Sequence, residues 1–281
     1  MNNITKKQHY VPQFYLRQFV DEDGLLHCYR KSDCKQFPAH TDDICFKKYG
    51  YEVKAPFGNN EFLLPNEIEN MFRTLEGEYD SVLKNVVKKC LLNSCGKALI
   101  CSSYEKEVLA SMTSNFIARN FLAVESFVDE DATDDLLKND EEIKNIDKLL
   151  REMNMGDVKP FLELAQKIVF FNPSIEGLTK SIIDNLLKMN VSFFVSDMMN
   201  FVTADCPVGY NCSTEEIFMA RIPLNPQVTM VYSNSDNSKM FRNRARLLDV
   251  RFVEKLNRDY VNWDVAQMVI AKKEKDMQFL I

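Results

Sequence analysis

Histidine is scarce in this chain: there are three among 281 residues, all within the first forty. Histidine is the side chain that most often exchanges protons near neutral pH. If a histidine acts as a general acid or base in this protein, it must be His9, His27 or His40. Glycine and proline are also few, at eight and nine residues, and hydrophobic residues make up 46% of the chain. This composition excludes a disordered or low-complexity protein and allows a large core.

Long hydrophobic runs are missing as well. No apolar segment approaches the roughly 20 residues that a membrane-spanning helix needs. The polar opening 1–8 is not followed by the apolar core of a signal peptide. We therefore expect a soluble cytoplasmic protein with no membrane partner. The P-loop and the GxGxxG, HExxH and GxSxG signatures are absent too, which disfavours the common nucleotide, hydride, metalloprotease and serine-hydrolase chemistries.

The eight cysteines include no CxxC pair. In a cytoplasmic protein such thiols are mostly reduced. Only Cys28, Cys34 and Cys45 lie near histidines, namely His27 and His40, and their spacing is too loose to match a zinc pattern. We expect these cysteines to behave as small buried apolar residues, and we expect no metal and no cofactor.

The net charge is −6 and the isoelectric point is near 5.3. An acidic chain disfavours a generally basic nucleic-acid binder, although a local basic patch remains compatible with it. The most basic stretch carries Arg242, Arg244, Arg246 and Arg251. Because guanidinium groups bind phosphate well, we predict that Arg244 and Arg246 contact a nucleotide or nucleic-acid phosphate. The alternative is that they are surface residues paired with acidic helices.

Residues 9–19 concentrate four aromatic rings, one histidine, one arginine and two glutamines. Pro12 fits the first turn of a helix, and we expect a short helix from there to about Phe19. Gln13 and Arg17 lie four residues apart, so both can point at one polar feature. The opposite, apolar face consists of Tyr15, Leu16 and Phe19. The stretch is either a buried polar anchor or part of a site.

Downstream of the N-terminal stretch, the spacing of apolar residues changes from helical to strand-like near residue 190. The helical part predicts helices over 65–92, 161–170 and 175–189. A Ser102–Glu105 capping box predicts the start of another helix. Residues 129–147 are rich in acid and are expected to form a charged surface segment. The alternating part predicts a strand over 25–31, a hairpin of 191–196 with 200–204, and a second of 217–222 with 228–232.

These elements predict an α+β fold: a mostly helical single domain with a small antiparallel sheet built largely from the C-terminal half. We divide the domain, residues 1–281, into an N-terminal motif and strand (9–31), a helical body (65–189), a sheet-rich part (190–252) and a C-terminal helix (253–271). A last strand is expected over 276–281.

Asp205 lies at the predicted end of a strand and is followed by Cys206 and Pro207. The residue before proline stays extended, so the chain leaves this point in a fixed direction. We predict that Asp205 orients His9 or pairs with Arg17. The alternative is a turn cap that closes the strand. No neighbour that would lower its pKa is evident for Cys206, which disfavours it as a nucleophile.

Several of these segments resemble motifs of an uncharacterised family of bacterial and phage proteins, catalogued as a domain of unknown function. Residues 9–19 are similar to its opening His-Tyr-Val-Pro-Gln-Phe-hydrophobic-Leu-Arg-any-Phe. Further similar segments follow in order: Ile68-Glu69, Leu75-Glu76, 201–208, 222–226 and Leu256-Asn257. Ala204 and Asn225 stand where serine is usual, and the helix around Arg119 lacks the expected Gln-any-any-Arg spacing. The resemblance implies one domain and no named activity, and it marks residues to test: His9, Gln13, Arg17, Asp205, Pro207 and Asn257.

The leading hypothesis is a nuclease-like effector that acts on a phosphate ester in one polar cleft. His9 is then the general acid or base, Arg17 binds developing negative charge, and Asp205 orients the histidine. The residues expected to bind a nucleic acid or nucleotide are Tyr10, Gln13, Asn257, Arg244 and Arg246. The competing hypothesis is a non-catalytic binding or interaction protein, such as a defence or regulatory component that holds a protein partner. On that view the N-terminal motif is a buried structural anchor.

Overall fold

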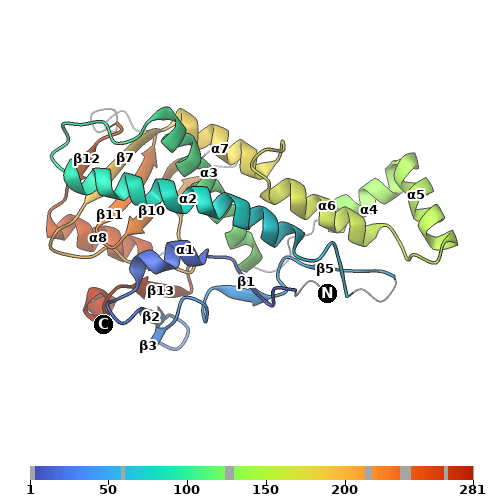
Figure 1. Ribbon diagram of the computed structural model, residues 1–281, viewed down its shortest axis with the longest axis horizontal. Helices are drawn as coiled ribbons and strands as arrows, with labels where there is room; N and C mark the ends of the chain where they lie inside the picture. Colours follow the sequence, from blue (N-terminus) through green and yellow to red (C-terminus); the bar gives the residue numbers. More distant parts are fainter. Residues whose placement is uncertain are drawn as a thin grey trace.

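A layer of long helices lies beside a five-stranded and a four-stranded sheet in the computed structural model of the protein, which also has two further two-stranded sheets (Figure 1). The structure describes residues 4–57, 61–123, 130–212, 217–234, 242–262 and 265–280. The helices are α1 (Gln13–Leu16), α2 (Glu67–Leu92), α3 (Ser103–Ala123), α4 (Glu130–Asn139), α5 (Glu141–Glu152), α6 (Lys159–Phe171), α7 (Leu178–Lys188) and α8 (Val250–Val261), with 3-10 turns η1 (Arg17–Phe19) and η3 (Glu274–Leu280).

The strands are short. They are β1 (Lys7–His9), β2 (Leu26–Arg30), β3 (Lys35–Ala39), β4 (Phe46–Lys48), β5 (Val53–Lys54), β6 (Phe62–Leu63), β7 (Asn190–Val195), β8 (Thr203–Ala204), β9 (Gly209–Cys212), β10 (Ile217–Asn225), β11 (Val228–Ser233), β12 (Ala245–Leu247) and β13 (Met268–Ala271). Strands β1 and β4 form one of the two-stranded sheets, and β5 and β6 form the other. The predicted α+β class is therefore confirmed, with a mostly helical body.

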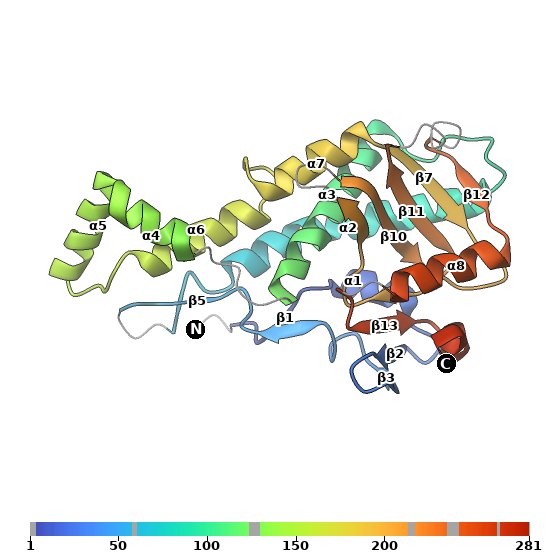
Figure 2. The ribbon, with the colours of Figure 1, turned by 180° about the vertical axis from the view of Figure 1, so that it is seen from behind.

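The larger sheet has five strands in the order β12-β7-β11-β10-β9. The predicted hairpin of β10 and β11 is confirmed, with Met219 opposite Ser233 and Asn225 opposite Val228. The edge strand β12 runs parallel to β7, so the sheet is mixed rather than purely antiparallel. Helices α2 and α7 pack against this sheet, and α8 crosses near its other side (Figure 2).

A second sheet of four strands, β3-β2-β13-β8, joins the two ends of the chain. The predicted hairpin of 191–196 with 200–204 is wrong, because β7 already pairs with β11 and β12, and β8 pairs with β13 instead. The predicted helix 253–271 ends ten residues early. Residues 268–271 form the central strand β13, since their apolar run pairs with β2. The expected last strand is the 3-10 turn η3.

Helix α3 runs through the middle of the molecule, and every residue from 112 to 120 is buried. Its predicted capping box is confirmed: the backbone N–H of Glu105 donates to Ser102 Oγ, and the N–H of Ser102 donates back to Glu105. At the far end of the helical layer, α4 and α5 project from the body as a hairpin (Figures 1 and 2). Among the described residues, no helix is long and apolar enough to cross a membrane.

The N-terminal stretch fastens the two sheets to the helices. The predicted helix over 12–19 is present as α1 continued by η1, and its apolar face is buried. The hydroxyl of Tyr15 donates to the carbonyl of Pro223 in β10 and shares a second hydrogen bond with Thr203 Oγ1 in β8, both at 2.7 Å. Because these strands belong to different sheets, one buried hydroxyl joins three parts of the fold.

We expect Tyr15→Phe to lower the free energy of unfolding by about 1–3 kcal/mol, since it leaves a buried carbonyl and a buried hydroxyl without their partner. The matched control is Tyr104→Phe, because Tyr104 is exposed and its hydroxyl donates only to Glu78. That change should stay within about 0.5 kcal/mol. Urea denaturation followed by circular dichroism measures both, and equal losses in the two variants would contradict the role given to Tyr15.

Candidate functional site

Three predicted site residues meet in one hydrogen-bonded chain at the N-terminus. The guanidinium of Arg17 donates to Gln13 Oε1 at 2.8 Å, and the Gln13 amide nitrogen lies 3.5 Å from His9 Nε2. His9 and Gln13 are half-buried, whereas Arg17 is exposed. The helical spacing of Gln13 and Arg17 places their side chains side by side, and the preceding strand β1 brings His9 next to Gln13. We call this set the His9–Gln13–Arg17 chain.

The His9–Gln13–Arg17 chain also determines where His9 carries its proton. Arg17 fixes the Gln13 oxygen, so the Gln13 amide N–H faces His9 and Nε2 must accept it. The other ring nitrogen then carries the hydrogen and donates to the backbone of Thr41. Burial lowers the pKa of His9, although the charge of Glu76 opposes this. At neutral pH His9 is therefore uncharged, and the lone pair of its Nε2 faces the Gln13 amide at 3.5 Å.

The backbone of His9 is held by two residues that the sequence did not assign to the site. Its carbonyl accepts a hydrogen bond from the hydroxyl of Tyr51 at 2.9 Å and from Arg119 at 3.5 Å. Arg119 is 1% exposed, stacks 3.5 Å from the ring centre of Phe72 and pairs with Glu76 at 2.7 Å. The available sequence signals for this pair were Arg119, the one arginine of α3, and the Leu75-Glu76 segment.

Asp205 occupies a different position from the one predicted. Its Oδ1 accepts hydrogen bonds from the backbone N–H groups of Gln267 and Met268, at 3.0 and 3.1 Å. These bonds link Asp205 to the start of β13, more than sixty residues along the chain, so they are neither the predicted contact with His9 or Arg17 nor a local turn cap. Burial raises the pKa of Asp205 to about 6, although the two N–H donors lower it. Asp205 is thus a carboxyl group that changes charge in mildly acidic solution.

Tyr10 is a member of the N-terminal motif that the charge of Asp205 reaches. Burial raises the pKa of Tyr10, and the negative charge of Asp205 acts in the same direction. Burial also raises the pKa of Cys206 to about 12, so this thiol is protonated and is a poor nucleophile. The described part of the chain contains no group of three or more histidine, cysteine or acidic side chains that could hold a metal ion.

The remaining predicted substrate-binding residues do not join the His9–Gln13–Arg17 chain. Asn257 is buried and bonds the backbone of Val202 and Asn200, at 3.2 and 2.9 Å. Arg244 donates to the carbonyls of Gly96 and Lys97. Both side chains therefore hold backbone segments together. Arg246 is exposed and lines a cavity of about 540 Å³ between the five-stranded sheet and α8, with Phe194, Met219, Phe252, Lys255 and Leu256 among the other lining residues.

One comparison with known proteins gives a match. A family model described as "Protein of unknown function (DUF4238)" matches residues 7–275, nearly the whole chain. No curated protein and no solved structure matches it.

The raised pKa of Asp205 predicts a specific pH dependence of stability. Between the unfolded value near 3.8 and the folded value of about 6, the folded protein binds more protons than the unfolded one. The stability contributed by Asp205 is therefore complete below pH 4 and is lost as the pH rises through 6. Asp205→Asn keeps the acceptor oxygen but does not titrate. Between pH 4 and pH 7 the wild type should therefore lose roughly 2 kcal/mol of unfolding free energy relative to this variant.

Asp33→Asn provides a control of opposite sign, because the hydrogen bond from Arg30 lowers the pKa of Asp33. As the pH rises, the free energy of unfolding of the wild type should increase relative to that of Asp33→Asn. Urea denaturation at half-unit pH steps measures both variants. A flat difference for Asp205→Asn would show that this carboxyl is not buried as described.

Replacing Gln13 tests the proton assignment of His9. Gln13→Glu places a carboxylate 3.5 Å from Nε2 and should raise the pKa of His9 by about one unit, from below 6.5 in the wild type. Gln18→Glu is the control, since Gln18 bonds the carbonyl of Phe14 and not His9. The pKa of His9 in both variants is measured by NMR titration of the carbon-bound imidazole protons. An unchanged pKa in Gln13→Glu would exclude the contact between Gln13 and His9.

Proposed function

The chain belongs to the DUF4238 family of proteins of unknown function, and we propose that it acts on a phosphate ester at the His9–Gln13–Arg17 chain, as a nuclease-like effector. The supporting observation is the pairing of an uncharged histidine base with an exposed guanidinium through a single glutamine. A base and a fixed cation are the two groups that phosphoryl transfer needs from protein side chains.

In the proposed reaction the 3.5 Å contact between the Gln13 amide and His9 Nε2 opens, and Nε2 takes the proton of the attacking hydroxyl or water. The oxygen of that hydroxyl or water forms a bond to phosphorus at the same time. The bond from phosphorus to the leaving oxygen breaks, and the imidazolium returns the proton to that oxygen. Arg17 binds the non-bridging oxygens, where negative charge accumulates. The charge of Glu76 favours the imidazolium. Arg119 and Tyr51 hold the His9 backbone and act as positioning residues.

A second candidate is binding without catalysis. It is supported by the burial of most of the N-terminal motif and by the backbone bonds of Asp205 and Asn257, which serve the fold. In this case the motif anchors the sheets, and the His9–Gln13–Arg17 chain contacts a partner's acidic group through Arg17 alone. The two candidates differ in what happens when the imidazole is removed.

We expect His9→Ala to lower kcat for a phosphodiester at least 100-fold, with fluorescently labelled single-stranded RNA, single-stranded DNA and bis(p-nitrophenyl) phosphate as substrates. Arg17→Ala should lower kcat/KM. Arg17→Lys should keep part of it, because lysine retains the charge but lacks the paired N–H donors of the guanidinium. The free energy of unfolding should barely change in His9→Ala, since Tyr51 and Arg119 bond its backbone carbonyl, which the substitution keeps.

His40→Ala is the matched control, because His40 is exposed and lies outside the His9–Gln13–Arg17 chain. It should keep full activity. If the wild type cleaves none of the three substrates, or if His9→Ala cleaves as well as the wild type, catalysis by this site is wrong. A loss of several kcal/mol of stability in His9→Ala would instead support the structural anchor.

A further inference from the structure

The projecting hairpin of α4 and α5 carries nearly all of the net charge of the protein. Residues 130–153 contain nine acidic and four basic side chains, a net charge of −5, whereas the whole chain carries −6. The rest of the chain is therefore close to neutral, at −1. A hairpin that stands away from the body with this charge concentrates negative potential at one end of the molecule (Figure 1).

The same hairpin has an apolar stripe that the body does not cover. None of the residues of α5, all of which the structure describes, is buried. Ile146, Leu149 and Met153 follow each other at helical spacing and are 47%, 56% and 66% exposed. Exposed leucines occur singly on most proteins, but a continuous stripe on an amphipathic helix marks an interaction surface.

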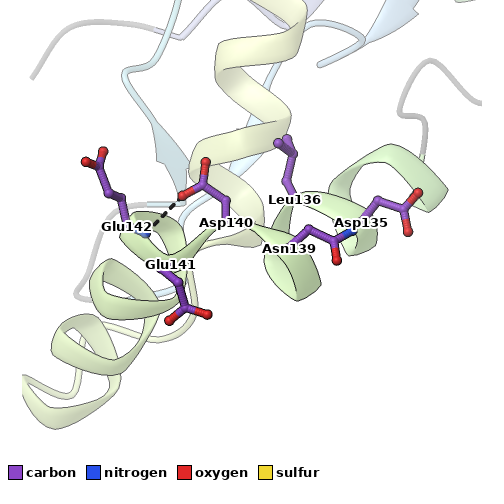
Figure 3. Close-up of a pocket in the computed structure, with 6 residues that line it drawn as sticks. All are labelled: Asp135, Leu136, Asn139, Asp140, Glu141 and Glu142. Carbon is purple, nitrogen blue, oxygen red and sulfur yellow. Dashed lines mark hydrogen bonds between the residues drawn. The ribbon is translucent and has the colours of Figure 1, made fainter.

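A hollow of about 900 Å³ opens at the corner between α4 and α5 (Figure 3). Leu136 lines it and is 40% exposed, and Asp140 and Glu142 point to the same side as Leu136. Asp140 caps α5 through the N–H of Glu142. Glu142 precedes Ile146 by one helical turn, so the hollow and the apolar stripe form one continuous surface.

Two carboxylates on this surface are available to a partner. Elsewhere on the hairpin, Asp134 pairs with Lys159, and Asp147 pairs with Arg151. Asp135 and Glu142 form no ion pair with any described residue. An apolar stripe that is bordered by unpaired acids is complementary to a helix with an apolar face bordered by lysine or arginine.

We propose that the α4–α5 hairpin is a docking surface for a basic amphipathic helix of a partner protein. An apolar side chain of that helix enters the hollow beside Leu136, its apolar face covers Ile146, Leu149 and Met153, and its cations pair with Asp135 and Glu142. A second copy of this chain fits less well, because two hairpins of charge −5 repel each other. The proposal does not depend on the activity at His9.

The test uses the full chain and a fluorescein-labelled 14-residue peptide with leucines at helical spacing and lysines elsewhere. We expect fluorescence anisotropy to give a micromolar Kd that weakens several-fold between 50 and 500 mM salt. Ile146→Ser with Leu149→Ser should weaken binding at least about tenfold, from lost apolar burial. Asp135→Asn with Glu142→Gln should weaken it about threefold and reduce the salt dependence.

The matched controls are Leu92→Ser, since Leu92 is 73% exposed on the body, and Glu107→Gln on the exposed side of α3. Both should bind within twofold of wild type, as should His9→Ala. A peptide of the same composition in scrambled order and one with glutamate for lysine should not bind. Equal binding of the scrambled peptide, no effect of the hairpin substitutions, or a dimer in sedimentation that Ile146→Ser dissociates would each overturn the proposal.

Discussion

The buried hydroxyl of Tyr15 is the interaction on which the rest of the fold depends. It bonds Thr203 in the four-stranded sheet and the Pro223 carbonyl in the five-stranded sheet, while the ring packs edge-on against Phe116 of α3. The two sheets have five and four strands and share no strand. They become one structure because the N-terminal segment lies between them. That position also leaves the polar residues of the segment, His9, Gln13 and Arg17, at the edge of the packed region instead of in it.

A second buried polar group supports the site from the helical side. Arg119 is enclosed by Phe72, Glu76 and the carbonyl of His9, so its charge is desolvated; it pairs directly with Glu76, and the charge of Glu69 also favours it. Such a pair contributes little net stability but is costly to break, and it fixes the positions of the groups it contacts. Here it links α2 and α3 to the strand that carries His9. The histidine backbone is thereby held in place, while its side chain lies half-buried beside Gln13.

Three groups of polar residues lie at different places in the fold, which the composition of the chain does not reveal. The His9–Gln13–Arg17 chain lies at the N-terminal segment, the arginine-rich stretch holds the edge of the five-stranded sheet, and the acidic α4–α5 hairpin stands at the opposite end of the helical layer. Arg244 bonds backbone carbonyls rather than a ligand, because β12 needs a connection to the loop after α2. The proposed docking surface and the proposed site therefore lie on different elements of the fold.

The sequence by itself determined what depends on neighbours along the chain. Helical spacing located α2, the Ser102–Glu105 box located the start of α3, short connections identified the β10–β11 hairpin, and the four-residue interval joined Gln13 to Arg17. Only the tertiary structure decided which distant segments meet. The apolar run 268–271 reads equally well as helix or strand, and its pairing with β2, some 240 residues earlier, makes it a strand. The partners of Asp205, which lie beyond residue 265, and those of Arg119 were likewise decided by the tertiary structure. Such long-range contacts depend on shape and burial, which a local sequence pattern does not contain.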